Sequence, residues 1–434
     1  MKKRVFAFVL TIILCTSVFS LSASAMPTSA SMNEAPSLSQ RDAVEYQSNL
    51  EYTALLDSFW GEYGRDDYPT YYAGAYLNSD GLLVVRVCEL TDDVRLDIQQ
   101  RTGNPNILLE ESSTSYNTLI SLKNMVTEYV ENNPDSSIVS NLLSTTVLDD
   151  TSTLEIGVED DSPASTAAIM TEVFPSTRSS ALSSIISFVT EDRDPVDYSA
   201  HLDETTSNSP YATTTTVYSG DMITTSSGYM SIGFPCRIKT SSGDYEYGFV
   251  TSAHGCENGG GISYNGTVIG TVKKWMLDGR VDCAFVKMTN RNFSFPHKIK
   301  LLDEDTGKTS IYPVSIGTNI NVAVGSAVNK DGATTNTTSG TVKSVDTDLY
   351  FDDLGKTLTN LIKTSPMCEP GDSGGLGFKI GSDSSTLKTS AIKFGIVEGH
   401  STILGITTAS YFINYRYIYS DMPVYSYQES AAPW

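Results

Sequence analysis

The sequence predicts an α+β domain followed by an all-β domain, and two observations carry this prediction. The 434 residues have a formal net charge of −22, but residues 27–210 hold 31 acidic and 8 basic side chains, whereas residues 211–434 hold 20 and 18. From Thr213 the composition also changes to Thr, Ser, Gly and Val, in short apolar runs with frequent turn residues. Both changes place a domain boundary near residues 200–217.

The start of the chain has the pattern of a secretory signal. Lys2, Lys3 and Arg4 precede an apolar run that ends near Cys15, and small residues close the segment as Ala23-Ser24-Ala25. This predicts a signal peptide over residues 1–25 and a secreted, extracellular protein. The apolar run is too short to span a bilayer, so we expect no membrane partner. The acidic surplus argues against nucleic acid as a partner.

Residues 26–210, the acidic region, show helix and strand patterns without a catalytic motif. The spacing of apolar residues predicts helices, a hairpin around Asn78–Gly81 and a strand, and the expected ranges are 41–63, 71–76 with 82–87, 115–132, 153–158, 165–173 and 179–190. The histidine here is His201 and the cysteine is Cys88. Residues 26–210 therefore read as an α+β domain with no chemistry of its own.

Residues 211–434 read as short strands with turns between them. The clearest runs are Met230–Phe234, Thr267–Val272 and Asn321–Val324, and no long helix is expected. Many short, regularly spaced strands are typical of an antiparallel barrel or sandwich.

A candidate nucleophile lies in Cys368-Glu369-Pro370-Gly371-Asp372-Ser373-Gly374-Gly375. Glycine permits a tight backbone path and close approach of a substrate carbonyl. That path can direct the N–H groups of Gly371 and Ser373 toward one point, where they would stabilise an oxyanion. Because a serine hydroxyl is a weak nucleophile alone, Ser373 needs a general base.

His254 and Asp282 are the candidate base and orienting acid. His254 ends the β-prone run Phe249–His254, and Asp282 leads into the apolar run Cys283–Val286. The chain order His254, Asp282, Ser373 is that of the chymotrypsin-type triad. Asp282 would hold the ring in the right tautomer and stabilise the imidazolium.

The same part of the chain allows two other sites. The segment Gly371–Gly375 also fits the G-x-S-x-G pattern of α/β-hydrolases, and Asp383 and His400 follow in the right order. They lie too close to the serine to leave room for the intervening elements of that fold. A zinc site would have to combine His254 with three cysteines, without any C-x-x-C signature, and these are Cys256, Cys283 and Cys368.

These motifs resemble the streptogrisin and α-lytic protease branch of the chymotrypsin-like serine peptidases. The resemblance covers most of residues 217–400, and its segments are Ser219–Asp221, Ser231–Phe234, Thr251–His254, Asp282–Val286, Val328–Gly332, Ser339–Val342 and Leu361–Gly375. It implies a catalytic domain of two six-stranded antiparallel barrels over residues 211–434. It also implies that residues 26–210 are a pro region that assists folding and inhibits the enzyme.

The same resemblance implies further roles. Cys236 and Cys256 would form a disulfide across the histidine, although Gly255 separates Cys256 from His254. Cys283 and Cys368 would be either bonded to each other or two buried thiols. Asp372 would be a buried acid that shapes the oxyanion loop, and His400 a candidate for the wall of the substrate pocket or a surface-loop histidine.

The expected function is a secreted serine endopeptidase made as a zymogen, with His254, Asp282 and Ser373 as its triad and no cofactor or metal. Its partners would be protein or peptide substrates and its own pro region. We expect the pro region to bind through apolar faces in residues 71–87 and 115–130, by extending a sheet edge. The alternative is a catalytically silent, peptidase-like binding protein.

Overall fold

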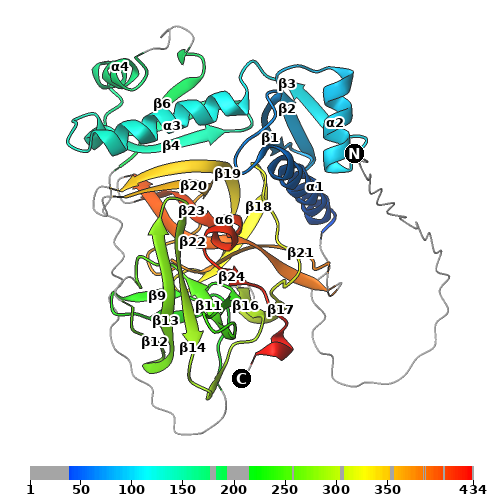
Figure 1. The fold of residues 1–434 in the computed structure, drawn as a ribbon, viewed down its shortest axis with the longest axis vertical. Helices are drawn as coiled ribbons and strands as arrows, with labels where there is room; N and C mark the ends of the chain where they lie inside the picture. Colours follow the sequence, from blue (N-terminus) through cyan, green and yellow to red (C-terminus); the bar gives the residue numbers. More distant parts are fainter. Residues whose placement is uncertain are drawn as a thin grey trace, which may run out of the picture. The chain divides into compact units, whose positions relative to one another are not determined.

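The computed structural model describes residues 39–175, 182–192, 215–256, 259–303, 307–351, 356–384, 386, 388–403 and 406–432. The expected signal peptide, His201 and the greater part of the expected boundary at 200–217 lie outside these ranges. Contacts group Ala35–Trp434 into one unit, and Figure 1 shows its elements.

Helix α1 (Gln40–Tyr63) confirms the first expected helix. Ser39 caps it, because its hydroxyl accepts from the Asp42 N–H while the Asp42 side chain accepts from the Ser39 N–H. Leu55 and Phe59, one turn apart, are fully buried. This apolar stripe holds the helix against the rest of the N-terminal region.

The predicted hairpin forms as β1 (Tyr72–Leu77) and β2 (Leu83–Val87). Strand β3 (Leu108–Glu111) joins β2 in parallel, and α2 (Asp92–Thr102) makes the crossover between them. Helix α3 (Tyr116–Asn132) confirms the second expected helix. The sequence reasoning missed α2 and β3, both of which are short and rich in charged residues.

The second part of the acidic region consists of β4 (Leu142–Leu148), β5 (Thr153–Val158), α4 (Pro163–Glu172) and β6 (Ile186–Thr190), with a 3-10 turn at Val139–Asn141. Strand β5 and helix α4 were expected. The expected helical turn over 179–190 is wrong at Ile186–Thr190, which is a strand parallel to β5. Ile186–Thr190 forms a strand because its backbone pairs with β5, and the local sequence does not reveal this partner.

The first barrel contains eight strands in the order β24-β10-β11-β14-β13-β12-β8-β9. Their bounds are β8 (Met222–Thr224), β9 (Tyr229–Ser231), β10 (Pro235–Lys239), β11 (Tyr245–Thr251), β12 (Gly261–Tyr264), β13 (Thr267–Asp278), β14 (Val281–Met288) and β24 (Val424–Tyr425). Just after β9, the Gly233 N–H donates to Val250 on β11 (2.8 Å). This bond brings the β9 end of the sheet back to β11.

The second barrel is a closed ring of six strands, because β18 pairs with both β21 and β19. Its strands are β18 (Ala327–Gly332), β19 (Asn336–Phe351), β20 (Lys356–Thr364), β21 (Leu376–Ser382), β22 (Thr389–Ile403) and β23 (Ile406–Asn414). Shorter elements complete the described chain: β7 (Thr215–Thr216), β15 (Phe293–Ser294), β16 (Lys298–Asp303), β17 (Lys308–Pro313), α6 (Tyr415–Asp421) and a 3-10 turn at Glu429–Ala431.

The predicted fold class is confirmed: a mostly β C-terminal region of two curved sheets follows a helix-and-strand N-terminal region. The first sheet differs from the six strands expected, because the short strands β9 and β24 extend it to eight. One expected strand, Asn321–Val324, is wrong. Its backbone is bound by the N-terminal region, since the Asn321 N–H donates to Thr53 Oγ1 (2.9 Å) and the Ala323 N–H to Asn49 Oδ1 (2.8 Å). These partners on α1 replace a neighbouring strand.

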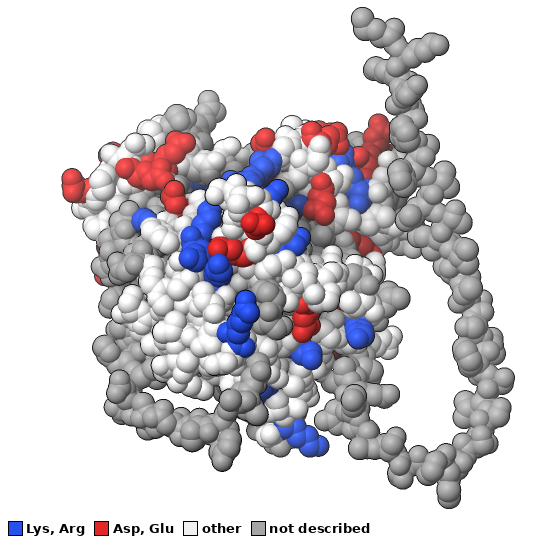
Figure 2. Space-filling view, turned by 60° about the horizontal axis from the view of Figure 1, so that its bottom comes forward, with Lys and Arg blue, Asp and Glu red and all other residues white. Residues whose placement is uncertain are grey.

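The two regions share a continuous sheet. Strand β4 pairs antiparallel with β19, with Thr146 opposite Thr347. The expected sheet extension is therefore present, but β4 makes it, and residues 71–87 contribute a single bridge between Tyr76 and Val324. The acidic surplus follows the N-terminal region, and in the face drawn in Figure 2 the acidic side chains gather toward the top.

Buried ion pairs add to this junction, which was expected to be mainly apolar. Lys123 on α3 contacts Asp346 (2.7 Å) and Asp348 (2.6 Å) on β19, and all three side chains are buried. Glu45 on α1 contacts Lys379 on β21 (3.0 Å). Removing one partner of a buried ion pair is strongly destabilising, because it leaves an unpaired charge in the protein interior.

Among the described residues, no helix is long and apolar enough to cross a membrane.

Replacing Lys123 with methionine should lower the free energy of unfolding by about 3–5 kcal/mol, because two buried carboxylates would lose their counter-charge. Urea unfolding of the full chain measures this loss. The control is Lys274→Met, since Lys274 is exposed on β13. Equal stability of the two variants would contradict a stabilising role for the Lys123 pairs.

Candidate active site

The loop that carries Ser373 has a backbone path that glycine permits. Gly371 has a φ of +94°, and a Cβ there would lie 2.2 Å from Cε2 of Tyr229. Gly374 has a φ of +85°, and a Cβ there would lie 2.2 Å from Oγ1 of Thr251. Residues with a side chain rarely adopt such φ values, and here they would also collide with neighbours. The glycines on both sides of Ser373 are therefore required by the local geometry.

Asp372 anchors this loop from inside the second barrel. Its carboxylate contacts Lys330 Nζ (2.9 Å), and both side chains are fully buried. It also accepts backbone N–H groups from Glu369 (3.0 Å), Thr334 (2.9 Å) and Thr335 (3.1 Å). A buried carboxylate with this many donors is fully satisfied. Asp372 thus lies where the sequence placed it, as a buried acid beneath the loop.

The loop leaves two N–H groups for a ligand. The N–H of Asp372 donates to Glu369 and that of Gly374 donates to Val397. Within the described chain, no hydrogen bond uses the N–H of Gly371 or of Ser373. These are the two donors that the sequence suggested for an oxyanion hole.

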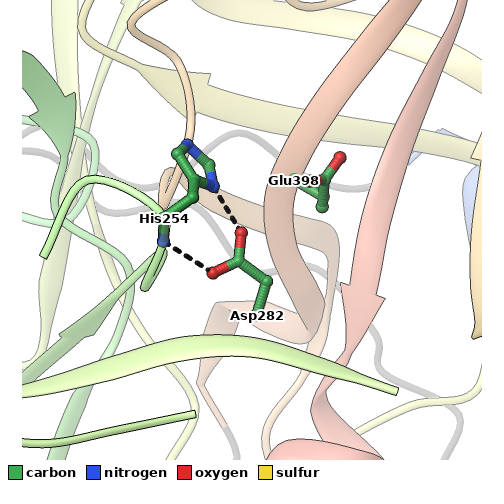
Figure 3. Close-up of side chains that lie close together, drawn as sticks. All are labelled: His254, Asp282 and Glu398. Carbon is green, nitrogen blue, oxygen red and sulfur yellow. Dashed lines mark hydrogen bonds and ion pairs between the residues drawn. The ribbon is translucent and has the colours of Figure 1, made fainter. Parts of the chain in front are cut away.

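His254 and Asp282 form the second half of the site, on the first barrel. His254 follows the end of β11, and Asp282 is the second residue of β14. The ring Nδ1 of His254 is hydrogen bonded to Oδ2 of Asp282, and the other carboxylate oxygen accepts the N–H groups of Ala253 and His254, the latter at 3.0 Å (Figure 3). Because Asp282 holds Nδ1, Nε2 is the nitrogen that faces a reacting group.

The two halves meet between the barrels. Ser373 Oγ donates to the carbonyl oxygen of Glu398 on β22 (3.1 Å), and Ser252 Oγ donates to that of Val397 (3.0 Å). His254 and Ser373 line one small cavity, together with Thr225, Ser227, Gly228, Tyr229, Met230, Gly255 and Gly371. The structure therefore brings the predicted base, acid and nucleophile to one place.

Glu398 is the residue that the sequence analysis missed. It directly follows the apolar residues Ile396 and Val397 on β22 and is 2% exposed. One carboxylate oxygen of Glu398, one ring nitrogen of His254 and one carboxylate oxygen of Asp282 all lie within 4.8 Å of one another. His254 and Asp282 are hydrogen bonded to each other within this group. The sequence feature that could have pointed to Glu398 is an acidic residue directly after an apolar run, where a buried side chain is expected.

The alternative sites are not formed. Asp383 accepts the Ile316 N–H (3.1 Å) and lies beside Tyr46 and Lys393, so it does not serve Ser373. His400 is half-buried on β22, opposite Ser410 on β23. Among the described residues, the set proposed for zinc does not come together around one point.

The expected Cys236–Cys256 disulfide is not formed in this structure. Both residues are free thiols, as are Cys88, Cys283 and Cys368. Cys236, Cys256 and Cys283 lie in the apolar core of the first barrel. Burial raises the pKa of all three thiols, that of Cys256 to about 12. Thiolates are the species that form disulfides, so this environment disfavours oxidation. Cys283 and Cys368 are two buried thiols and are not bonded to each other, which is one of the two states expected for them.

Comparison with known proteins gives two results. Residues 32–114 match the family described as Pro-like N-terminal domain. Similar solved structures include a Nocardiopsis protease, with 22% sequence identity and a TM-score of 0.40, and Thermobifida fusca protease A, with 21% identity and a TM-score of 0.38. A third is a glutamic acid specific serine protease that utilises a histidine triad in substrate binding, with 25% identity and a TM-score of 0.39. Each comparison covers 49% of this chain and 100% of the other. The Pro-like match lies within residues 26–210, where the resemblance drawn from the motifs placed a pro region.

Replacing Gly371 with alanine should slow the labelling of Ser373 by a fluorophosphonate at least ~100-fold, because the loop must move an oxyanion donor to admit the Cβ. The control is Gly266→Ala in the turn between β12 and β13, where φ is +73° but a Cβ meets nothing within 4 Å. Labelling at the same rate in both variants would show that Gly371 is not part of the reactive loop.

Proposed function

We propose that this chain is an exported serine endopeptidase made as a zymogen. The observation that carries the proposal is the His254–Asp282 hydrogen bond beside a cavity that Ser373 also lines. A serine needs an adjacent base, and that base needs a partner that fixes its tautomer. The secretory pattern of residues 1–25 supports export.

The proposed reaction uses side chains and backbone alone. Ser373 turns its hydroxyl from the Glu398 carbonyl toward Nε2 of His254 and attacks the scissile carbonyl carbon as His254 takes the proton. Asp282 stabilises the resulting imidazolium. The N–H groups of Gly371 and Ser373 bind the oxyanion. His254 then protonates the leaving amine, and water hydrolyses the acyl-enzyme by the same steps. The chemistry requires no cofactor.

Substrates of this site would be peptide bonds in proteins or peptides. We retain His400 as the candidate for the wall of the substrate pocket, because it lies two residues beyond Glu398 on the same strand. A histidine in that wall would favour an acidic side chain of the substrate.

Ser373→Ala should leave the precursor uncut within residues 200–217, because cleavage there would be autocatalytic. The purified variant is incubated beside the parent chain and both are analysed by mass and N-terminal sequencing. A fluorophosphonate probe should label Ser373 of the parent only. Normal processing of the variant with no other protease present would show that the cut is not autocatalytic, and a folded parent without label would favour the silent binding protein.

Residues 26–210 should be needed for residues 211–434 to fold. Strand pairings in β-rich domains are mostly non-local, so unaided folding is slow, and β4 and α1 offer partners to β19, β21 and the segment Asn321–Val324. Residues 211–434 are refolded from denaturant with and without separately made 26–210. Activity only with the added region, then inhibition by its excess, is expected. Equal recovery of activity in both samples would contradict the folding role.

A further inference from the structure

Glu398 occupies a β-bulge that directs its side chain into the candidate active site. Pairing between β22 and β23 passes from Val397 opposite Phe412 to Gly399 opposite Tyr411, so Glu398 is the extra residue. A bulge re-aims a side chain that regular alternation would place elsewhere, and bulges are frequent next to active sites.

The backbone of the bulge and of the residue before it is hydrogen bonded to the loop that carries Ser373. The Val397 N–H donates to Gly375 (2.8 Å), and the Val397 carbonyl accepts from the Gly374 N–H (2.8 Å). The Glu398 carbonyl itself accepts from Ser373 Oγ. The backbone that carries the Glu398 side chain is therefore tied to the loop that carries Ser373.

The surroundings of this carboxyl group contain little to balance a negative charge. Its Oε1 is buried and has no hydrogen-bond partner within the described residues. The titratable groups that face it are Asp282 from β14, His254 from the end of β11 and the thiol of Cys368 from the nucleophile loop. Figure 3 shows the three side chains of Glu398, Asp282 and His254 together. Among these described groups, His254 is the one that could supply a positive charge, when it is protonated.

An ionised Glu398 would place two carboxylates in one buried site with a neutral imidazole. Burying an unpaired charge is costly, and two neighbouring carboxylates disfavour the second ionisation. Asp282 is the carboxyl group whose oxygens are satisfied, because it accepts two backbone N–H groups and is hydrogen bonded to the ring of His254, whereas Oε1 of Glu398 has no hydrogen-bond partner among the described residues. Glu398 is therefore the carboxyl group that takes up a proton, which removes one of the two negative charges.

We propose that Glu398 is a positioning residue that holds a proton while His254 acts as the base, so that the Asp282–His254 pair works beside a neutral carboxyl group. The inference rests on the proposed function, since it concerns the protonation state of that same site. Burial, followed by the charge of Asp282, raises the pKa of Glu398 to about 8, in agreement with the geometry.

The proton on Glu398 then links the active site to alkaline pH. Loss of that proton adds a second negative charge close to His254, which favours the imidazolium and raises the pKa of His254. Two such groups titrate as a coupled pair. Below the pKa of Glu398, His254 titrates beside a neutral neighbour, and a neutral amide in place of Glu398 would leave the pKa of His254 unchanged.

The test is an NMR titration of the full chain labelled with ¹⁵N-histidine, in EDTA, with Ser373→Ala present throughout to prevent self-cleavage. Chains with Glu398 and with Glu398→Gln are compared. We expect the pKa of His254 to agree in the two chains to within about 0.3, and a further change of the His254 signal near pH 8 only in the chain with Glu398. A fall in the pKa of His254 by about one or more in Glu398→Gln would overturn the proposal, because it would show that glutamate had been charged.

A second measurement decides the question if Glu398→Gln does not fold. The chain that retains Glu398 is labelled with ¹³C at the glutamate carboxyl carbons and titrated from pH 4 to 10. One buried carboxyl signal that changes only above about pH 7 is expected, whereas ionisation of every glutamate below about pH 6 would overturn the proposal. Fluorophosphonate labelling of the parent chain is run in parallel. Failure of that labelling speaks against the proposed peptidase and leaves the titration readable.

Discussion

The arrangement of the site depends on the carboxylate of Asp282. One of its oxygens accepts the N–H groups of Ala253 and His254 and the other holds the ring of His254, so a single buried group fixes both the backbone turn and the side chain. Asp372 has a similar place in the second barrel, where it ties the loop that carries Ser373 to Lys330. The two halves of the site are thus built by two buried acids, one in each barrel. Asp282 holds the ring of His254, whereas Asp372 is paired with Lys330 and holds a loop.

The second constraint is the contact between the acidic region and the second barrel. It combines a shared sheet with ion pairs that are shielded from water, at Lys123 and at Lys379. Backbone pairing between strands needs correct register, and each buried charge needs its partner within reach. This contact therefore favours one arrangement of the acidic region on the second barrel over arrangements shifted by a residue or more. A contact made of apolar surface alone would allow the acidic region to bind in more orientations.

Much of this structure could be predicted from local patterns. Helices α1 and α3 carry apolar residues at helical spacing, and the glycines around Ser373, with His254 and Asp282, identified the site. The misses have a common physical origin. Ile186–Thr190 and Asn321–Val324 adopt their conformations because of partners far away in the sequence, on β5 and α1. Glu398 reaches the site through a bulge, and a one-residue irregularity in strand pairing leaves no periodic signal.

Strand β19 has 16 residues, and its pairing changes along its length: Asn336–Thr341 closes the barrel on β18, and Thr347–Leu349 accepts β4. A second barrel without the acidic region would leave that last segment as an open strand edge, and such edges invite pairing with other chains. Asp346, just before this segment, and Asp348, within it, would then lose Lys123 and present two negative charges. Charges at an open edge repel an incoming strand. The same two aspartates that fasten the acidic region would therefore protect the separated barrel against aggregation.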